Sequence, residues 1–232
     1  MKRYHARWVL PISAPPIEHA TVVVENDRIA YVGPRGDAPP GEDCDLGDAI
    51  LLPGLVIAHC HLELTTLRGF LEDLGFAQWI MRLNAVKRAV LDREALFDSA
   101  RFGLVEGIRH GITTYADTCD SGVAFDAMLE AGVRGIMYQE VFGPDPSGCD
   151  RSIGELRGKI ELLRPRQTPL VRVGVSPHAP YTVSDALYAA VAALACTPKP
   201  APTEPASSAP ASPAGRGGSG PGRGASAAVR AL

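Results

Sequence analysis

The hydrophobic pattern of residues 53–195 alternates between short apolar runs and longer amphipathic stretches. In residues 97–108, for example, apolar side chains recur three and four positions apart, which is the period of an amphipathic helix. Strands that alternate with helices predict βαβ units and therefore a parallel sheet. The predicted strands are 55–59, 111–117, 133–141 and 170–176, and the predicted helices are 76–91, 92–110, 125–134, 151–164 and 184–195.

These elements make about four βα units, which is half the number in a (β/α)8 TIM barrel. We therefore predict an α/β fold of TIM-barrel type that is incomplete, with its first half in residues 53–195. A central strand of a parallel sheet is apolar on both faces, and the run before His59 has this character.

Residues 1–52 have the pattern of short strands, predicted at 6–12, 21–25 and 28–32. Asn26 and Asp27 tolerate the positive φ of a tight turn, so the second and third of these strands are expected to form a hairpin. The apolar run 49–58 is predicted to be one further strand, which leads into the next region.

The last part of the chain has a composition of its own. Thr197–Leu232 contains nine Ala, seven Pro, six Gly and five Ser, and its only branched apolar residues are Val229 and Leu232. Such a segment buries too little surface to offset the entropy of ordering it. We therefore predict a disordered tail over residues 196–232.

Composition narrows the class of partner. The formal net charge is −3 and no block of basic residues occurs, which argues against nucleic acid and favours a small-molecule substrate. The longest uncharged apolar run is too short to span a bilayer, so no membrane partner is expected. The five cysteines are widely spaced, which is typical of a reducing compartment, and we predict a cytoplasmic protein.

The strongest chemical signal is the pair His59 and His61 at the end of an apolar strand. A spacing of two places both imidazoles on one face of a strand, where they can reach the same metal ion. Two structural or surface histidines are the alternative interpretation, which the preceding apolar run and the following Glu63 make less favourable. Carboxylates often orient ligating histidines, and Glu63 could brace the site in this way.

Two blocks of sequence resemble the amidohydrolase superfamily. LLPGLVIAHCHLELTTLRG at 51–69 resembles the signature of its first barrel strand, and GVSPHAPYTVS at 174–184 resembles the segment after its fourth. The similarity is greatest to the branch of metal-dependent deaminases and chlorohydrolases that includes cytosine, guanine and adenosylhomocysteine deaminases, and also to the aminodeoxyfutalosine deaminases. It implies a TIM barrel flanked by a small β-sandwich, to which residues 1–52 would contribute.

The resemblance implies that His59 and His61 bind a catalytic divalent metal, zinc above iron. The implied reaction is deamination of a purine, pyrimidine or related ring by water that the metal activates. The resemblance therefore implies that the chain derives from a hydrolase that acts on non-peptide carbon–nitrogen bonds.

The same resemblance makes His178 a residue that contacts the substrate ring. A turn histidine between two prolines is the alternative. Gln78 and Trp79 fall in the loop that lines the pocket in this branch, although a tryptophan packed in the core is an equal alternative. Glu140 is expected at the end of the third strand, facing the pocket or else solvated or locally paired.

The sequence departs from the family pattern after His178. The family expects two further histidines, a proton-shuttling glutamate and a strand-8 aspartate, yet no histidine follows His178. We interpret the chain as a truncated copy that is inactive alone, with a tail whose composition suggests a frameshift. The alternative is a non-catalytic metal- or partner-binding fragment, and the open edges of a half barrel would favour a homo-oligomer.

Overall fold

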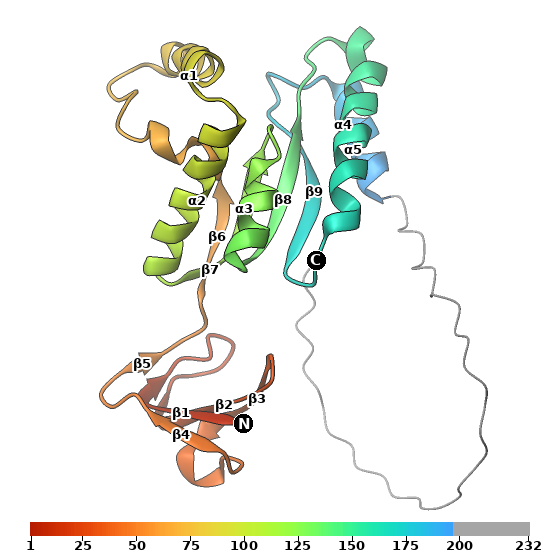
Figure 1. Ribbon diagram of the computed structural model, residues 1–232. Coiled ribbons are helices and arrows are strands. Elements are labelled where there is room, and N and C mark those ends of the chain that lie inside the picture. The colour runs from red at the N-terminus through yellow and green to blue at the C-terminus, as the bar shows by residue number, and fades with distance from the viewer. Residues whose placement is uncertain (197–232) are drawn as a thin grey trace, which may run out of the picture. The chain divides into compact units, whose positions relative to one another are not determined.

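The computed structural model describes residues 1–196, which form two β-sheets and the helices that follow the second one (Figure 1). The predicted tail lies outside these residues except for Cys196, the last residue of a helix. Within the described residues, no helix is both long enough and apolar enough to cross a membrane.

The N-terminal sheet has the strand order β3-β2-β1-β4, and a short β5 also pairs with β1. The predicted hairpin is confirmed, because β2 and β3 are antiparallel and Asn26 takes a positive φ of 53° in the turn. The fourth strand escaped prediction because its residues are all exposed and show no apolar alternation. The strands are β1 (Lys2–Val9), β2 (Ile17–Glu25), β3 (Arg28–Pro34), β4 (Glu42–Asp45) and β5 (Ile50–Leu51).

The prediction of one strand over residues 49–58 is wrong. The run divides into β5, in the N-terminal sheet, and β6 (Leu55–Cys60), in the second sheet. Pro53 separates them because proline has no N–H to donate to a sheet. Gly54 lies so close to Thr113 that a Cβ there would clash with the threonine side chain.

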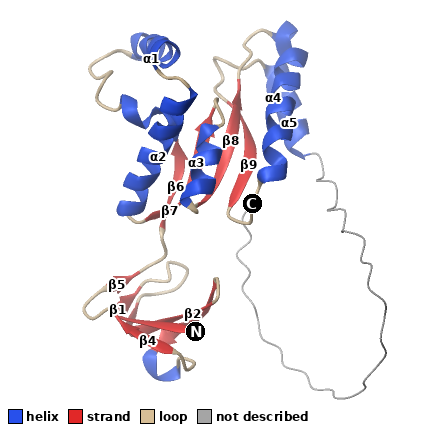
Figure 2. Ribbon diagram, in the orientation of Figure 1, coloured by secondary structure: helices blue, strands red, loops and turns tan. Residues whose placement is uncertain are grey.

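The predicted parallel sheet and its helices are confirmed. Its order is β6-β7-β8-β9, and all neighbouring pairs are parallel. Figure 2 shows helices following the strands in alternation, as in part of a TIM barrel. The further strands are β7 (Ile112–Cys119), β8 (Arg134–Val141) and β9 (Val171–Pro177), and the helices are α1 (Phe76–Val90), α2 (Arg93–Arg109), α3 (Val123–Ala131), α4 (Cys149–Leu163) and α5 (Asp185–Cys196).

Helix α2 illustrates how the sequence produces this packing. The Asp92 carboxylate caps its first turn by accepting a hydrogen bond from the Ala95 N–H at 2.8 Å. Leu96, Ala100 and Leu104 recur every four residues and are buried against the sheet. Figure 1 shows the opposite situation for α1, which lies beyond the carboxyl ends of the strands and buries only Leu83.

Candidate functional site

The carboxyl ends of the four parallel strands meet at one edge of the sheet, as parallel strands require. His59 lies near the end of β6, and His61 follows that strand. Thr118 and Glu140 lie near the ends of β7 and β8, and His178 follows β9. The fold thus gathers polar residues that are far apart in the sequence.

His59 and His61 lie together, with ring centroids 5.0 Å apart and ring planes at 88°. The spacing of two along the chain is sufficient to bring the two imidazoles into contact. His59 is exposed, and within residues 1–196 its ring has no hydrogen-bond partner. The pair can therefore present nitrogen lone pairs to a shared ligand.

A backbone contact fixes the orientation and tautomer of His61. Its Nδ1 lies 3.0 Å from the carbonyl oxygen of Thr118, which can only accept, so Nδ1 carries the proton and donates. Nε2 then holds the lone pair, and its nearest polar contact is a long one of 3.4 Å to Thr118 Oγ1. Burial and the neighbouring His59 lower the pKa of His61, so the imidazole is neutral, as a metal ligand must be.

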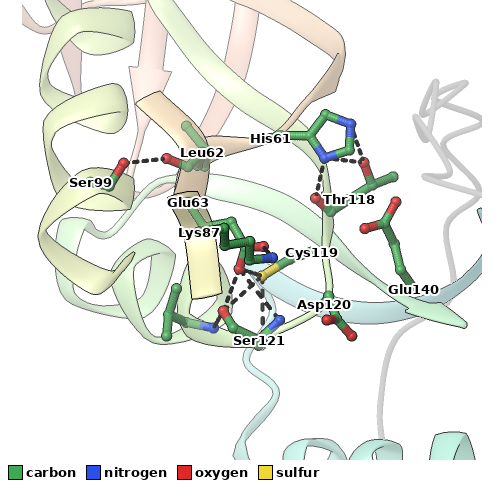
Figure 3. A network of polar contacts seen from close by, with 12 residues as sticks. His61, Leu62, Glu63, Lys87, Ser99, Thr118, Cys119, Asp120, Ser121 and Glu140 are labelled. Carbon is green, nitrogen blue, oxygen red and sulfur yellow. Dashed lines mark hydrogen bonds and ion pairs between the residues drawn. The ribbon is translucent and has the colours of Figure 1, made fainter. Parts of the chain in front are cut away.

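Glu63 contacts other residues than the two histidines. Its buried carboxylate, 2% exposed, accepts hydrogen bonds from Lys87, Cys119 and Ser121, as Figure 3 shows. Burial by itself would raise the pKa of Glu63, but these hydrogen bonds outweigh burial and lower it. Lys87 belongs to α1, so this ion pair connects α1 to the segment that follows β6 and braces the helix, not the imidazoles.

Asp117 supports the backbone turn that follows His61. Its Oδ1 accepts from the Leu62 N–H at 2.7 Å and contacts the Cys60 thiol at 3.6 Å. Its Oδ2 is buried with no hydrogen-bond partner among the described residues. Burial raises the pKa of Asp117 to about 8, so the carboxyl keeps its proton at neutral pH.

His178 is held by Thr182, whose Oγ1 lies 2.8 Å from Nδ1. That hydroxyl donates its own proton to the Ala179 carbonyl, so it accepts from Nδ1–H and leaves the lone pair on Nε2. Burial lowers the pKa of His178. The residue therefore offers a neutral hydrogen-bond acceptor to an N–H or O–H group of a ligand.

The remaining predicted substrate residues are placed as follows. Gln78 is exposed in the first turn of α1, and Trp79 beside it is 36% exposed, so Trp79 is no core residue. Glu140 is buried, and no hydrogen bond or ion pair to its carboxylate is found within residues 1–196. Burial, together with the charges of Glu63 and Asp120, raises the pKa of Glu140 to about 7.

Sequence reasoning missed Thr118 and Lys87. Thr118 sits at the carboxyl end of a predicted strand, and that position was a usable signal. Lys87 lies 24 residues from Glu63, on a helix whose direction the sequence did not reveal.

The donors at this edge fit a metal ion as two of its ligands. Neutral imidazoles with free lone pairs suit zinc and related ions, and the fixed tautomer of His61 is the support that ligating histidines usually receive. Within residues 1–196, no three side chains of the His, Cys, Asp or Glu types come together as a complete metal site.

Comparisons with known proteins identify relatives of this chain. The chain is 33% identical to the 5-methylthioadenosine/S-adenosylhomocysteine deaminase of Moorella thermoacetica over 75% of its own length and 42% of that protein. It is 31% identical to the deaminase of the same name from Pyrococcus furiosus over 72% and 41% of the two chains. The chain therefore spans less than half the length of these relatives.

Two solved structures share the fold. The aminofutalosine deaminase of Helicobacter pylori, in complex with methylthio-coformycin, aligns with a TM-score of 0.75 and 16% identity over 84% of this chain and 48% of that one. The atrazine chlorohydrolase TrzN of Arthrobacter aurescens, in complex with zinc, aligns with a TM-score of 0.72 and 21% identity over 84% and 50%. At these identities the match demonstrates the fold.

A family model described as the amidohydrolase family matches residues 50–196. That range includes both blocks on which the predicted resemblance was based, and the resemblance is confirmed. The chain belongs to the amidohydrolase family.

Proposed function

We propose that this chain provides the first half of a metal-dependent site that removes an exocyclic amino group from a purine, pyrimidine or related ring. The observation that carries the proposal is the His59–His61 pair at the end of β6, with the proton of His61 held on Nδ1 by the Thr118 carbonyl. The deaminases among its relatives support the choice of reaction. The free cysteines fit the reducing interior of a cell.

His59 and His61 would hold the ion, for which we propose zinc because a structure of the same fold contains it. The ion supplies the activation of water for attack on a ring carbon. The chain's own residues bind and orient. His178 Nε2 accepts a hydrogen bond from a substrate N–H or O–H group, and Trp79 lies on the helix at the same edge.

Glu140 adds a group that can hold or release a proton near neutral pH. Its pKa of about 7 lies near neutral pH. General acid–base catalysis is most efficient when the pKa of the group lies near the working pH. It lies one strand away from Thr118, the partner of His61, at the same edge of the sheet. We propose that it faces the substrate.

The test joins residues 1–196 in frame to the C-terminal half of the Moorella thermoacetica deaminase and measures ammonia release from 5-methylthioadenosine and S-adenosylhomocysteine. We expect zinc-dependent release by the hybrid, loss of at least about 100-fold in His59→Ala and His61→Ala, and no change in His110→Ala, which alters an exposed histidine at the C-terminus of α2. The 232-residue chain alone should release none.

Two results would contradict the proposal. A folded hybrid that contains zinc but deaminates neither compound would show that this half does not serve that reaction. Zinc-dependent turnover by the 232-residue chain alone would show that a half site is sufficient, against the expectation of an inactive chain.

A further inference from the structure

Strand β6 leaves the parallel sheet at the histidine pair. The register between β6 and β7 shifts between Ile57 and Cys60, and Cys60, opposite Asp117, is the last residue of β6 to pair with β7. Beyond it the chain turns at His61 and enters a short 3-10 helix, Leu62–Leu67. The sheet ladder therefore ends one residue before His61 and does not fix the backbone there.

The Asp117 side chain supplies the hydrogen bond that the ladder does not. Its Oδ1 accepts from the Leu62 N–H at 2.7 Å, and Leu62 is the first residue of the short helix. The first N–H groups of a helical segment have no partner within it and must be satisfied by other groups. The same oxygen contacts the Cys60 thiol at 3.6 Å. One carboxyl oxygen thus contacts the residues on both sides of His61.

Asp117 acts from the face of the sheet opposite to the imidazoles. Successive side chains of a strand point to opposite faces. Tyr115 and Cys119, two positions before and after Asp117, lie in the core that the sheet forms with helices α2 and α3. Thr118 points the other way, and its hydroxyl lies 3.2 Å from His61 Nδ1. Asp117 therefore does not face the histidine pair, and it acts on His61 through the backbone.

Two adjacent residues of β7 together hold His61. The Thr118 carbonyl accepts from Nδ1, as Figure 3 shows, and Asp117 holds the amide of the next residue, Leu62. The first contact fixes the ring and the second fixes the backbone that carries it. Without the backbone contact the turn is free to move away from β7, and Nδ1 then loses its acceptor. Because the hydrogen bond of one ring nitrogen decides which nitrogen is protonated, the Nε2 lone pair depends on both contacts.

Burying the Asp117 carboxyl has a cost that packing does not explain. The residue is 0% exposed, and its Oδ2 has no hydrogen-bond partner within residues 1–196. Leaving a buried polar atom unpaired is destabilising, and a valine of nearly the same size would avoid it. Valine, however, offers no acceptor to the Leu62 N–H. The acceptor is the property that distinguishes Asp117 from an apolar residue at this position.

We propose that Asp117 is a positioning residue for the metal site. It anchors the turn at Leu62, and the anchored turn keeps the proton of His61 on Nδ1 and leaves Nε2 free to bind the ion. Groups that support ligating histidines usually contact the imidazole itself, whereas Asp117 acts one residue further along the chain. Its importance for the reaction rests on the proposed function, but its effect on His61 is present in the metal-free chain.

The test uses the full chain labelled with ¹⁵N-histidine, without zinc, at pH 7.5, where the lowered pKa of His61 leaves its ring neutral. The ¹⁵N shifts of the two ring nitrogens report which of them carries the proton, and the loss of signals in His61→Ala identifies those of His61. We expect the Nδ1–H form in the parent. Asp117→Asn keeps an oxygen acceptor for Leu62 and should give the same form. Asp117→Val keeps the bulk without the acceptor and should lose the preference for Nδ1–H.

Calorimetric titration with zinc gives a second readout on the same proteins. Asp117→Val should bind zinc about 10-fold more weakly than the parent, and Asp117→Asn should bind it as the parent does. Circular dichroism confirms that each variant is folded, and Asp117→Ala takes the place of Asp117→Val if that variant does not fold.

Tyr115→Phe is the matched control. Tyr115 is buried on the same strand and the same face as Asp117, and its hydroxyl donates to the Leu104 carbonyl at 3.3 Å. The variant loses a buried hydrogen bond far along the strand from the turn, so it should be less stable while the His61 signals and the zinc affinity stay as in the parent. A merely structural role for Asp117 would give Asp117→Val this same outcome.

The proposal is overturned if folded Asp117→Val keeps the Nδ1–H form of His61 and the zinc affinity of the parent, or if the parent itself has the proton on Nε2. It is also overturned if Asp117→Asn behaves like Asp117→Val, or if Tyr115→Phe changes His61 equally. An inactive hybrid enzyme with the expected His61 signals would contradict the proposed function alone. An active hybrid, with His61 unchanged in Asp117→Val, would contradict only this inference.

Discussion

The two sheets differ in how completely the fold supplies hydrogen-bond partners for their histidines. In the N-terminal sheet, buried His5 has both ring nitrogens engaged, with Thr21 Oγ1 at 2.7 Å and Asp43 Oδ1 at 2.9 Å. At the end of the parallel sheet, the described hydrogen bond of His178 engages Nδ1 alone, and His61 has a 3.0 Å contact at Nδ1 but only a long one of 3.4 Å at Nε2. The fold thus holds both ring nitrogens of His5 closely, whereas each of these two histidines keeps one nitrogen without a close partner among the described residues.

Carboxylates show the same contrast. Asp43 and Asp45 in the N-terminal sheet lie at the surface, where neighbouring groups lower the pKa of each. The parallel sheet instead buries Glu63, Asp117 and Glu140 near its carboxyl edge. Strongly perturbed ionisable groups concentrate where a fold serves chemistry, and in this chain they lie in the second sheet.

The largest expected effect comes from Asp117, whose pKa burial raises from 3.8 to about 8. Between pH 4 and pH 8 the folded state keeps a proton that the unfolded state loses. The free energy of unfolding should therefore fall with rising pH across this window, by about 5 kcal/mol in total. Glu63, Cys60 and Glu140 are the neighbouring titratable groups.

Asp117→Asn removes this titration, so the stability of the variant relative to the parent should increase from pH 5 to pH 8. Urea unfolding at several pH values measures it, and Asp48→Asn, which alters an exposed carboxylate, is the control. If the stability of Asp117→Asn and of the parent changes equally with pH, the pKa of Asp117 is not raised, and the contrast between the two sheets loses this carboxyl group.

A somewhat smaller effect is expected from Lys87→Met, which leaves the buried Glu63 carboxylate without its cation. Breaking a buried pair in this way costs about 3–5 kcal/mol. Adding Glu63→Gln should recover most of the loss, and Arg88→Met, at the exposed neighbouring position, should have little effect. If urea unfolding gives Lys87→Met and Arg88→Met the same stability, the ion pair does not hold α1.

The smallest effect should come from His5→Leu. The change leaves the buried Thr21 hydroxyl without its partner, at a cost of about 1–3 kcal/mol. His19→Asn, at an exposed position on β2 whose φ of 49° asparagine tolerates, should cost nothing measurable. Because His5 is structural, its replacement should leave zinc binding intact, and a His5→Leu protein that is stable but binds less zinc would erase the distinction between the two sheets.

Much of the fold follows from periodicity. The strands of the parallel sheet have apolar runs bounded by amphipathic helices, and the β2–β3 hairpin has Asn26 in its turn. The sequence could not predict β4, whose polar residues pair with β1 only through tertiary context. Pro53 and Gly54 did signal the break that the predicted 49–58 strand ignored.

The candidate site also has a part that the sequence predicts and a part that only the fold creates. The proximity of His59 and His61 follows from their spacing, because a strand fixes the direction of its side chains. The Lys87–Glu63 pair and the contact between Phe76 and Tyr181 join segments that only the folded chain brings together. No local pattern encodes the direction of α1 on which both contacts depend.

The central claim is that the pair at the end of β6 is the metal-binding part of this chain, and calorimetric titration with zinc tests it most directly. Two imidazoles provide fewer ligands than the three protein ligands of a typical catalytic zinc site, so we expect one weak site. His59→Ala/His61→Ala should abolish it, whereas His5→Leu and His110→Ala should bind zinc as the parent does. Unchanged zinc binding in the double variant would contradict the account.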